Sequence, residues 1–152
     1  MTLQDKLKQY QQEGKALLAT NFYNFETLKS VLVAASQMKT PVILQLTRSS
    51  IEYMGLKEAV ALGRSGLSDY GIEGWIHLDH GDSVDLVKAC LDAGFDSVMI
   101  DASEKNIEEN IRISSEVVRL AASYGANVEA ELGYVAKLGQ QQAGGFTTAE
   151  EA

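Results

Sequence analysis

The 152-residue sequence has only one cysteine, no long hydrophobic run and no cluster of basic residues. Cys90 has no partner for an intrachain disulfide, and it falls on the apolar side of an expected helix, so we expect it to pack as a small hydrophobic side chain. No apolar run approaches the length of a bilayer span, and residues 1–14 lack the apolar core of a signal peptide. These absences favour a cytoplasmic protein that does not interact with a membrane.

The charge balance is acidic, with 13 Lys and Arg against 21 Asp and Glu and a formal net charge of −8. Because basic residues neither cluster nor alternate with aromatic ones, we expect no nucleic-acid partner. An acidic total leaves an anionic substrate open, since helix N-termini and backbone amides can hold a phosphate locally. A sugar phosphate therefore remains a possible substrate.

Short apolar runs alternate with longer amphipathic segments along the whole chain, which we expect to form a single domain over residues 1–152. The expected strands are 16–21, 41–47, 74–79, 96–101 and 127–132, and the expected helices are 26–38, 51–62, 84–93 and 107–124. Such β-α alternation predicts an α/β fold with a parallel sheet, either a barrel or a doubly wound sheet. No glycine-rich dinucleotide fingerprint follows the first expected strand, which argues against a nucleotide-binding fold.

Polar side chains recur where the expected strands end. They are Asn21, Thr47, Asp79 with His80, Asp101, and Glu129 with Glu131. A single polar strand end is usually a helix cap, but in a parallel barrel all of these ends converge on the face where such enzymes keep their sites. The pattern therefore favours a site at the carboxyl ends of the strands.

The segment Trp75–Gly81 is the most informative of these, because it reads as a strand that ends on an acid, a histidine and a glycine. At that position a carboxylate can move protons and a neutral imidazole can bind a metal. The simpler alternative is that Asp79 caps the next helix and His80 is a histidine at the rim. Strand alternation puts His77 and Asp79 on one face and His80 on the other, unless the strand has already ended.

The C-terminal part of the sequence is polar and rich in glycine, which predicts a mobile loop over residues 137–146. Residues 147–150 then carry a capping-box signature that announces a helix. We therefore expect the chain to be part of a larger fold.

Taken together, several of these pieces resemble the class II, metal-dependent ketose-bisphosphate aldolases. The resemblance is carried in order by segments 19–24, 41–45, 77–81, 97–103 and 128–133. It implies a TIM (β/α)₈ barrel, here a partial barrel of about five parallel strands with outer helices. It also implies a lyase of glycolysis in which zinc polarises the ketose carbonyl and stabilises the enediolate formed as the C3–C4 bond breaks. The products would be dihydroxyacetone phosphate and glyceraldehyde 3-phosphate.

The resemblance assigns roles residue by residue. Asp79 matches the acid/base that exchanges a proton with the C4 hydroxyl, and His80 matches the first histidine on the catalytic zinc. Asp101 and Glu131 match carboxylates near a second or alternative metal position.

Two further positions, Asn21 and Thr47, match polar groups that bind the substrate, although the family often has serine at the second. The family's other two zinc histidines lie on strands beyond the fifth. His77 is the only other histidine here, and its place on the same strand means that it cannot simply replace them.

The sequence therefore favours the N-terminal part of a class II aldolase, whose complete site requires a C-terminal segment or a homo-oligomer. We expect the isolated chain to bind zinc weakly and to lack measurable aldolase activity. One alternative is a non-catalytic fragment that acts as a self-associating or partner-completing module. A second is an unrelated phosphate-binding α/β protein.

Overall fold

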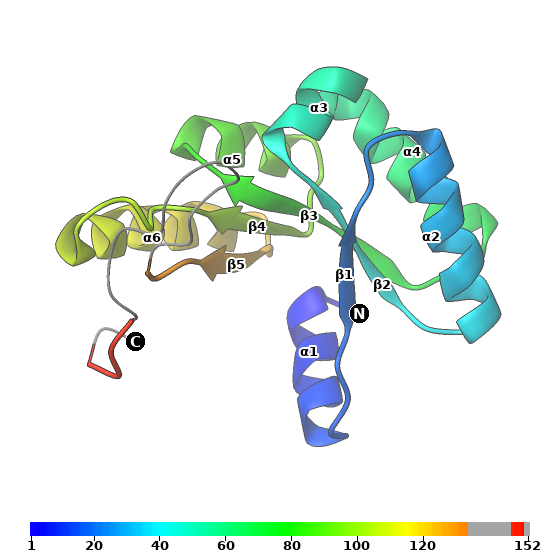
Figure 1. The fold of residues 1–152 in the computed structure, drawn as a ribbon, viewed down its shortest axis with the longest axis horizontal. Helices are drawn as coiled ribbons and strands as arrows, with labels where there is room; N and C mark the ends of the chain where they lie inside the picture. The colour runs from blue at the N-terminus through cyan, green and yellow to red at the C-terminus, as the bar shows by residue number, and fades with distance from the viewer. Residues whose placement is uncertain (134–146, 151–152) are drawn as a thin grey trace.

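The computed structural model of the protein describes residues 1–133 and 147–150, so the predicted loop 137–146 lies outside the described residues. Within them the chain forms one parallel sheet with the sequential strand order β1-β2-β3-β4-β5 (Figure 1). The strands are β1 (Leu18–Asn21), β2 (Val42–Leu46), β3 (Gly74–Gly81), β4 (Ser97–Ile100) and β5 (Asn127–Ala130). All five predicted strands are present.

The helices are α1 (Leu3–Gln12), α2 (Phe25–Met38), α3 (Arg48–Met54), α4 (Leu56–Asp69), α5 (Val84–Asp92) and α6 (Ile107–Ala122). The predicted helix over 51–62 is wrong in detail, because the segment forms two helices that meet at Gly55. Gly55 has a φ of 88°, a conformation that glycine adopts without the steric cost of a side chain. Thr47 caps the first of the two helices.

One face of the sheet packs against helices α2 to α6 (Figure 1). Alternate strand residues such as Leu44, Ile76 and Val98 are fully buried there, as period-two alternation requires. Cys90 of α5 belongs to this core, and burial raises the pKa of its thiol to about 12, so it packs as an inert apolar group.

The opposite face of the sheet carries α1, which packs Leu3 and Leu7 against Ile43 and Trp75 near the starts of β2 and β3. This helix was not among those expected from the sequence. Because α1 covers the amino ends of the strands, the carboxyl ends of the same face stay clear of it (Figure 1).

The face of the sheet that carries α1 is its inner face, and a row of polar residues crosses it at one level. The strand registers pair its members in succession, and they are Asn21, Gln45, His77, Ser97 and Asn127. Residues side by side in a parallel sheet share a face, and Asp79, two residues beyond His77, lies on it as well. The inner face therefore becomes polar toward the carboxyl ends of the strands.

A doubly wound sheet reverses its strand order at a switch point, whereas here the order follows the sequence throughout the described residues. Sequential parallel strands with outer helices form part of a (β/α) barrel. No helix in the described part of the chain is both long enough and apolar enough to cross a bilayer.

Candidate active site and metal centre

The end of β3 departs from regular strand geometry. Its register against β4 shifts between Leu78 and Gly81, and His80 has a φ of 51°. Such a bulge re-aims a side chain at a strand end, so the simple alternation that would put His80 among the helices does not hold. Gly81 permits the close approach to β4, because a methyl group there would lie 2.5 Å from the carbonyl oxygen of Met99.

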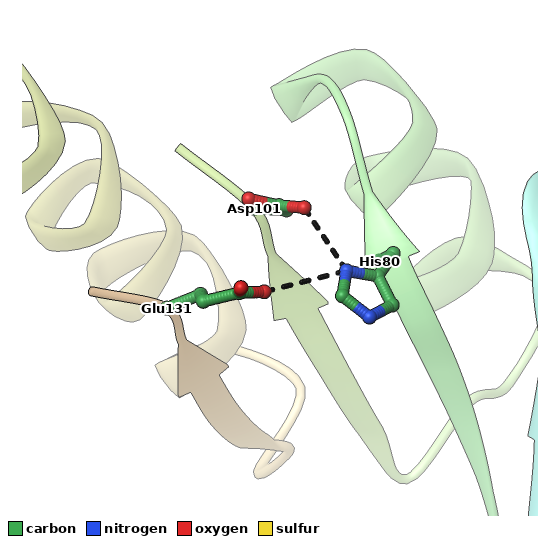
Figure 2. A group of neighbouring side chains, drawn as sticks. All are labelled: His80, Asp101 and Glu131. Atoms are coloured by element: carbon green, nitrogen blue, oxygen red, sulfur yellow. Dashed lines mark hydrogen bonds and ion pairs between the residues drawn. The ribbon is translucent and has the colours of Figure 1, made fainter. Parts of the chain in front are cut away.

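The re-aimed His80 meets two carboxylates from the ends of the next two strands (Figure 2). Its Nδ1 lies 2.9 Å from Asp101 Oδ2 and 3.4 Å from Glu131 Oε2. Potential ligand atoms of the three side chains all lie within 4.8 Å of one another. The structure thus brings together the three residues that the resemblance assigned to metal positions.

The carboxylates of the cluster favour the protonated form of His80. The hydrogen bond to Asp101 raises the pKa of His80 and outweighs the opposing effect of partial burial. Burial tends to raise the pKa of Asp101, but hydrogen bonds from Ser103 and His80 reverse this, and the net pKa is lowered. The negative charge of Glu131 also raises the pKa of His80.

Both acidic residues also accept hydrogen bonds from outside the cluster, Asp101 through its carboxylate and Glu131 through its backbone oxygen. Asp101 Oδ1 accepts hydrogen bonds from the Ser103 hydroxyl at 2.6 Å and from the Ser103 backbone at 3.1 Å. The buried Asn110 of α6 donates to the backbone oxygen of Glu131 at 2.8 Å. The cluster is therefore supported by its own strand ends and by a helix of the outer layer.

The three side chains offer ligand atoms of the kinds that a divalent metal ion such as zinc accepts. Zinc accepts imidazole nitrogen and carboxylate oxygen, and two tetrahedral ligands at the usual bond lengths lie about 3.4 Å apart. The bond from His80 Nδ1 to Asp101 also resembles the carboxylate–histidine pairs that orient metal ligands, and it leaves Nε2 on the opposite edge of the ring (Figure 2).

Asp79 points along the inner face in the other direction, toward β1 and β2. Its two oxygens accept hydrogen bonds from Asn21 Nδ2 at 2.8 Å and from Gln45 Nε2 at 3.4 Å. The cap of α5 is Ser83, whose Oγ accepts from the backbone of Leu86. The alternative in which Asp79 caps the next helix therefore does not describe this structure.

Thr47 has a different environment from the other predicted site residues. It is the N-cap of α3, and its hydroxyl accepts from the backbone of Ser50 at 3.3 Å. The next residue, Arg48, forms an ion pair with Asp82 and so links the start of α3 to the loop after β3. The structure thus joins Asn21 directly to Asp79 and places Thr47 in the neighbouring loop.

His77 lies on the same face as Asp79, but it is only 3% exposed. Its Nδ1 is 2.8 Å from Ser97 Oγ, and burial lowers its pKa to about 4. Nε2 lies 3.4 Å from Glu129 Oε2, yet the geometry of that contact makes no hydrogen bond. Because the His77 ring is neutral at pH 7, its contact with Glu129 is not an ion pair.

Sequence reasoning gave no role to Gln45 or to Ser97. The signal for Gln45 was available, since it is the one polar residue in the otherwise apolar run Val42–Leu46. Ser97 carried no comparable signal. Serine is common in turns, and Ser97 lies next to the expected start of its strand.

The sequence of the chain matches the family model of class II fructose-bisphosphate aldolase over residues 1–152. A fructose-bisphosphate aldolase from Geobacillus stearothermophilus is 47% identical over 118 residues, which are 76% of this chain and 41% of that protein. One from Giardia intestinalis is 41% identical over 133 residues, 87% of this chain and 41% of that protein.

The fold is similar to that of known aldolases as well. The crystal structure of the YdjI aldolase from Escherichia coli K12 superposes with a TM-score of 0.82 at 29% identity, covering 90% of this chain and 53% of that one. This chain thus spans about half the length of the proteins that it matches. Sequence and fold together show that the chain belongs to the class II fructose-bisphosphate aldolase family.

Proposed function

We propose that this chain supplies the acid/base residue and one side of the zinc site of a class II aldolase. The enzyme would cleave a ketose 1,6-bisphosphate into dihydroxyacetone phosphate and glyceraldehyde 3-phosphate, or condense the two, in the carbohydrate metabolism of the cytoplasm. The observation that carries the proposal is that Asp79 and His80, adjacent in sequence, serve two different clusters on either side of the end of β3.

In this proposal His80 is a zinc ligand, and Asp101 and Glu131 orient its ring or hold a neighbouring metal position. Zinc, when bound, polarises the carbonyl of the ketose as a Lewis acid. The imidazole of His80 must be neutral to bind a metal, so binding requires the release of the proton that its carboxylate neighbours favour.

Asp79 in turn exchanges a proton with the C4 hydroxyl of the substrate. The two amide donors on its oxygens hold the carboxylate in one orientation, which general acid-base catalysis requires. Asn21, through its contact with Asp79, and Thr47, in the neighbouring loop, are the proposed substrate-binding side chains on this half of the site.

A catalytic zinc usually has three protein ligands, and His80 is the only histidine at the cluster. We therefore propose that the remaining ligands come from a complementing C-terminal segment, or from another subunit in a homo-oligomer. The second candidate, a non-catalytic partner-completing module, is favoured by the same shortage of ligands, and it predicts complex formation without turnover.

The test is a pair of substitutions in the complex of this chain with the remaining portion of the Geobacillus stearothermophilus relative. Asp79→Asn keeps the size of the side chain and one of its two acceptor oxygens but removes the basic carboxylate. Turnover of fructose or tagatose bisphosphate should fall by roughly a hundred- to ten-thousandfold while zinc stays bound. His80→Ala should remove both zinc and activity, because it deletes a ligand.

Zinc content and turnover are measured on the same samples. Full activity in Asp79→Asn with unchanged zinc would contradict the acid/base role. Retention of zinc in His80→Ala at the parental affinity would contradict the metal role.

A further inference from the structure

We propose that Glu129 is a further substrate-binding residue and that His77 positions it, so that the Glu129 carboxylate accepts a hydrogen bond from a hydroxyl group of the ketose. This assignment rests on the proposed function, in which the sugar lies over the inner face of the sheet beside Asp79. It gives a role to a buried histidine that neither the acid/base step nor the metal centre uses.

His77 has a buried nitrogen without a hydrogen-bond partner. The residue is 3% exposed, and within the described part of the chain its Nε2 makes no hydrogen bond. Buried polar atoms are nearly always paired, so an exception calls for an explanation such as a role in a site. The nearest candidate partner is Glu129, whose Oε2 lies 3.4 Å from Nε2.

Two neighbours decide which ring nitrogen of His77 carries the proton. The ring is neutral at pH 7, because burial lowers its pKa to about 4. Its Nδ1 lies 2.8 Å from Ser97 Oγ, which can donate to it, whereas an ionised Glu129 beside Nε2 can only accept. A lone pair on Nε2 would face a negative charge. The arrangement therefore favours a hydrogen on Nε2 and a hydrogen bond from Ser97 to Nδ1.

Glu129 shares the inner face with Asp79. It lies two residues beyond Asn127 on β5, as Asp79 lies two residues beyond His77 on β3, and the strand registers place His77 and Asn127 in the same polar row. The Glu129 side chain is 58% exposed, so rotation about its own bonds can bring the carboxylate into line with Nε2 of His77. Held in this way, the carboxylate faces the space beside Asp79.

A carboxylate at this position matches the hydroxyl groups of an open-chain ketose. Each hydroxyl can donate, and hydrogen bonds to an ionised acceptor are roughly twice as strong as those between neutral groups. Since Asp79 is assigned to the C4 hydroxyl, Glu129 accepts from another hydroxyl of the same sugar. That hydroxyl keeps its proton throughout the reaction. The contact is therefore equally strong before and during cleavage, and its loss affects KM more than kcat.

A metal site shared by His77 and Glu129 fits less well. Among the described residues, the side chains that lie close enough together to hold an ion are His80, Asp101 and Glu131. His77 and Glu129 do not belong to that group. Two protein ligands are fewer than a bound zinc usually has.

The first test is nitrogen-15 NMR of the isolated chain at pH 7, with a chelator present. The expected signature is the tautomer of His77 with its hydrogen on Nε2. The signals are assigned by comparison with His77→Asn, since His80 is the only other histidine of the chain. The opposite tautomer would overturn the proposal, because a bare Nε2 cannot donate to Glu129. Coordination of Nε2 on addition of zinc would overturn it as well.

The second test measures KM and kcat in the complex with the remaining portion of the Geobacillus stearothermophilus relative. Glu129→Gln should raise KM for fructose or tagatose bisphosphate by about ten- to a hundredfold, with kcat changed by less than about threefold. Glu116→Gln on α6, where the side chain is 45% exposed, is the matched control and should leave both constants unchanged.

Two substitutions of His77 test the positioning role. His77→Asn, whose amide is too short to reach Glu129, should raise KM, whereas the longer amide of His77→Gln should restore most of the parental value. Combining His77→Asn with Glu129→Gln should be no worse than Glu129→Gln alone, because both remove one interaction.

A parental KM in Glu129→Gln, a loss of kcat at unchanged KM, or additive effects in the double variant would overturn the proposal. An inactive parent complex would instead contradict the proposed function, and the tautomer of His77 would still decide the positioning role on the isolated chain.

Discussion

Replacing His77 with glutamine should flatten the dependence of the unfolding free energy on pH between about pH 4 and pH 6.5. The His77 ring is 3% exposed, and burial lowers its pKa from 6.5 to about 4. In this window the unfolded chain binds a proton that the folded chain excludes. Unfolding is therefore favoured as the pH falls, so stability is complete above pH 6.5 and is lost toward the folded pKa.

The size of the effect follows from the two pKa values. The whole pKa shift corresponds to about 3 kcal/mol of unfolding free energy, of which roughly 2 kcal/mol is lost between pH 7 and pH 5. Urea unfolding of the parent and His77→Gln chains at several pH values, with a chelator present, measures the difference. Glutamine can still bond to Ser97 but does not titrate, so the slope with pH, and not the absolute stability, is diagnostic.

His80→Gln is the control for this measurement. Because the folded pKa of His80 is raised, its stabilisation is present below pH 6.5 and is lost as the pH rises through that pKa. The control should therefore keep the slope of the parent below pH 6. An unchanged low-pH slope in His77→Gln would refute the reasoning that proton uptake by His77 on unfolding destabilises the fold between pH 6.5 and pH 4.

Substitutions at three further positions test the local structure around the site. Gly81→Ala should destabilise the chain by about 1–3 kcal/mol in urea, because a methyl group there overlaps the Met99 carbonyl; parental stability would show that β3 and β4 do not approach so closely. Ser83→Ala should cost about 1 kcal/mol as the cap of α5 is lost, and Ser83→Asn should restore it. Asn110→Ala should weaken zinc binding about tenfold or more by releasing the Glu131 backbone, as titration calorimetry would detect; unchanged affinity would make Asn110 purely structural.

The order of strands and helices could be predicted from the sequence because the spacing of apolar residues differs between strands and helices. The convergence of polar groups followed from parallel pairing alone, since Asn21, Asp79 and Asp101 end strands that all point the same way. Their detailed contacts followed less well. Asp79 bonds to Gln45 of the neighbouring strand β2, a residue to which the sequence assigned no role.

The direction of His80 could not be predicted, because it depends on a bulge and a positive φ that result from the packing of β3 on β4. Helix α1 was missed for a similar reason. Its helical pattern is read easily only once Ile43 and Trp75 are known to provide an apolar surface for it. Long-range packing, and not local propensity, decides both features.

The central claim, that this chain holds part of an aldolase site, is tested most directly by one assay of ketose-bisphosphate cleavage. The chain is assayed with zinc, alone and after mixing with the remaining portion of the Geobacillus stearothermophilus relative, which is assayed alone as well. The account predicts turnover in the mixture and in neither part by itself. Turnover by the isolated chain, or a stable zinc-loaded complex without turnover, would contradict it.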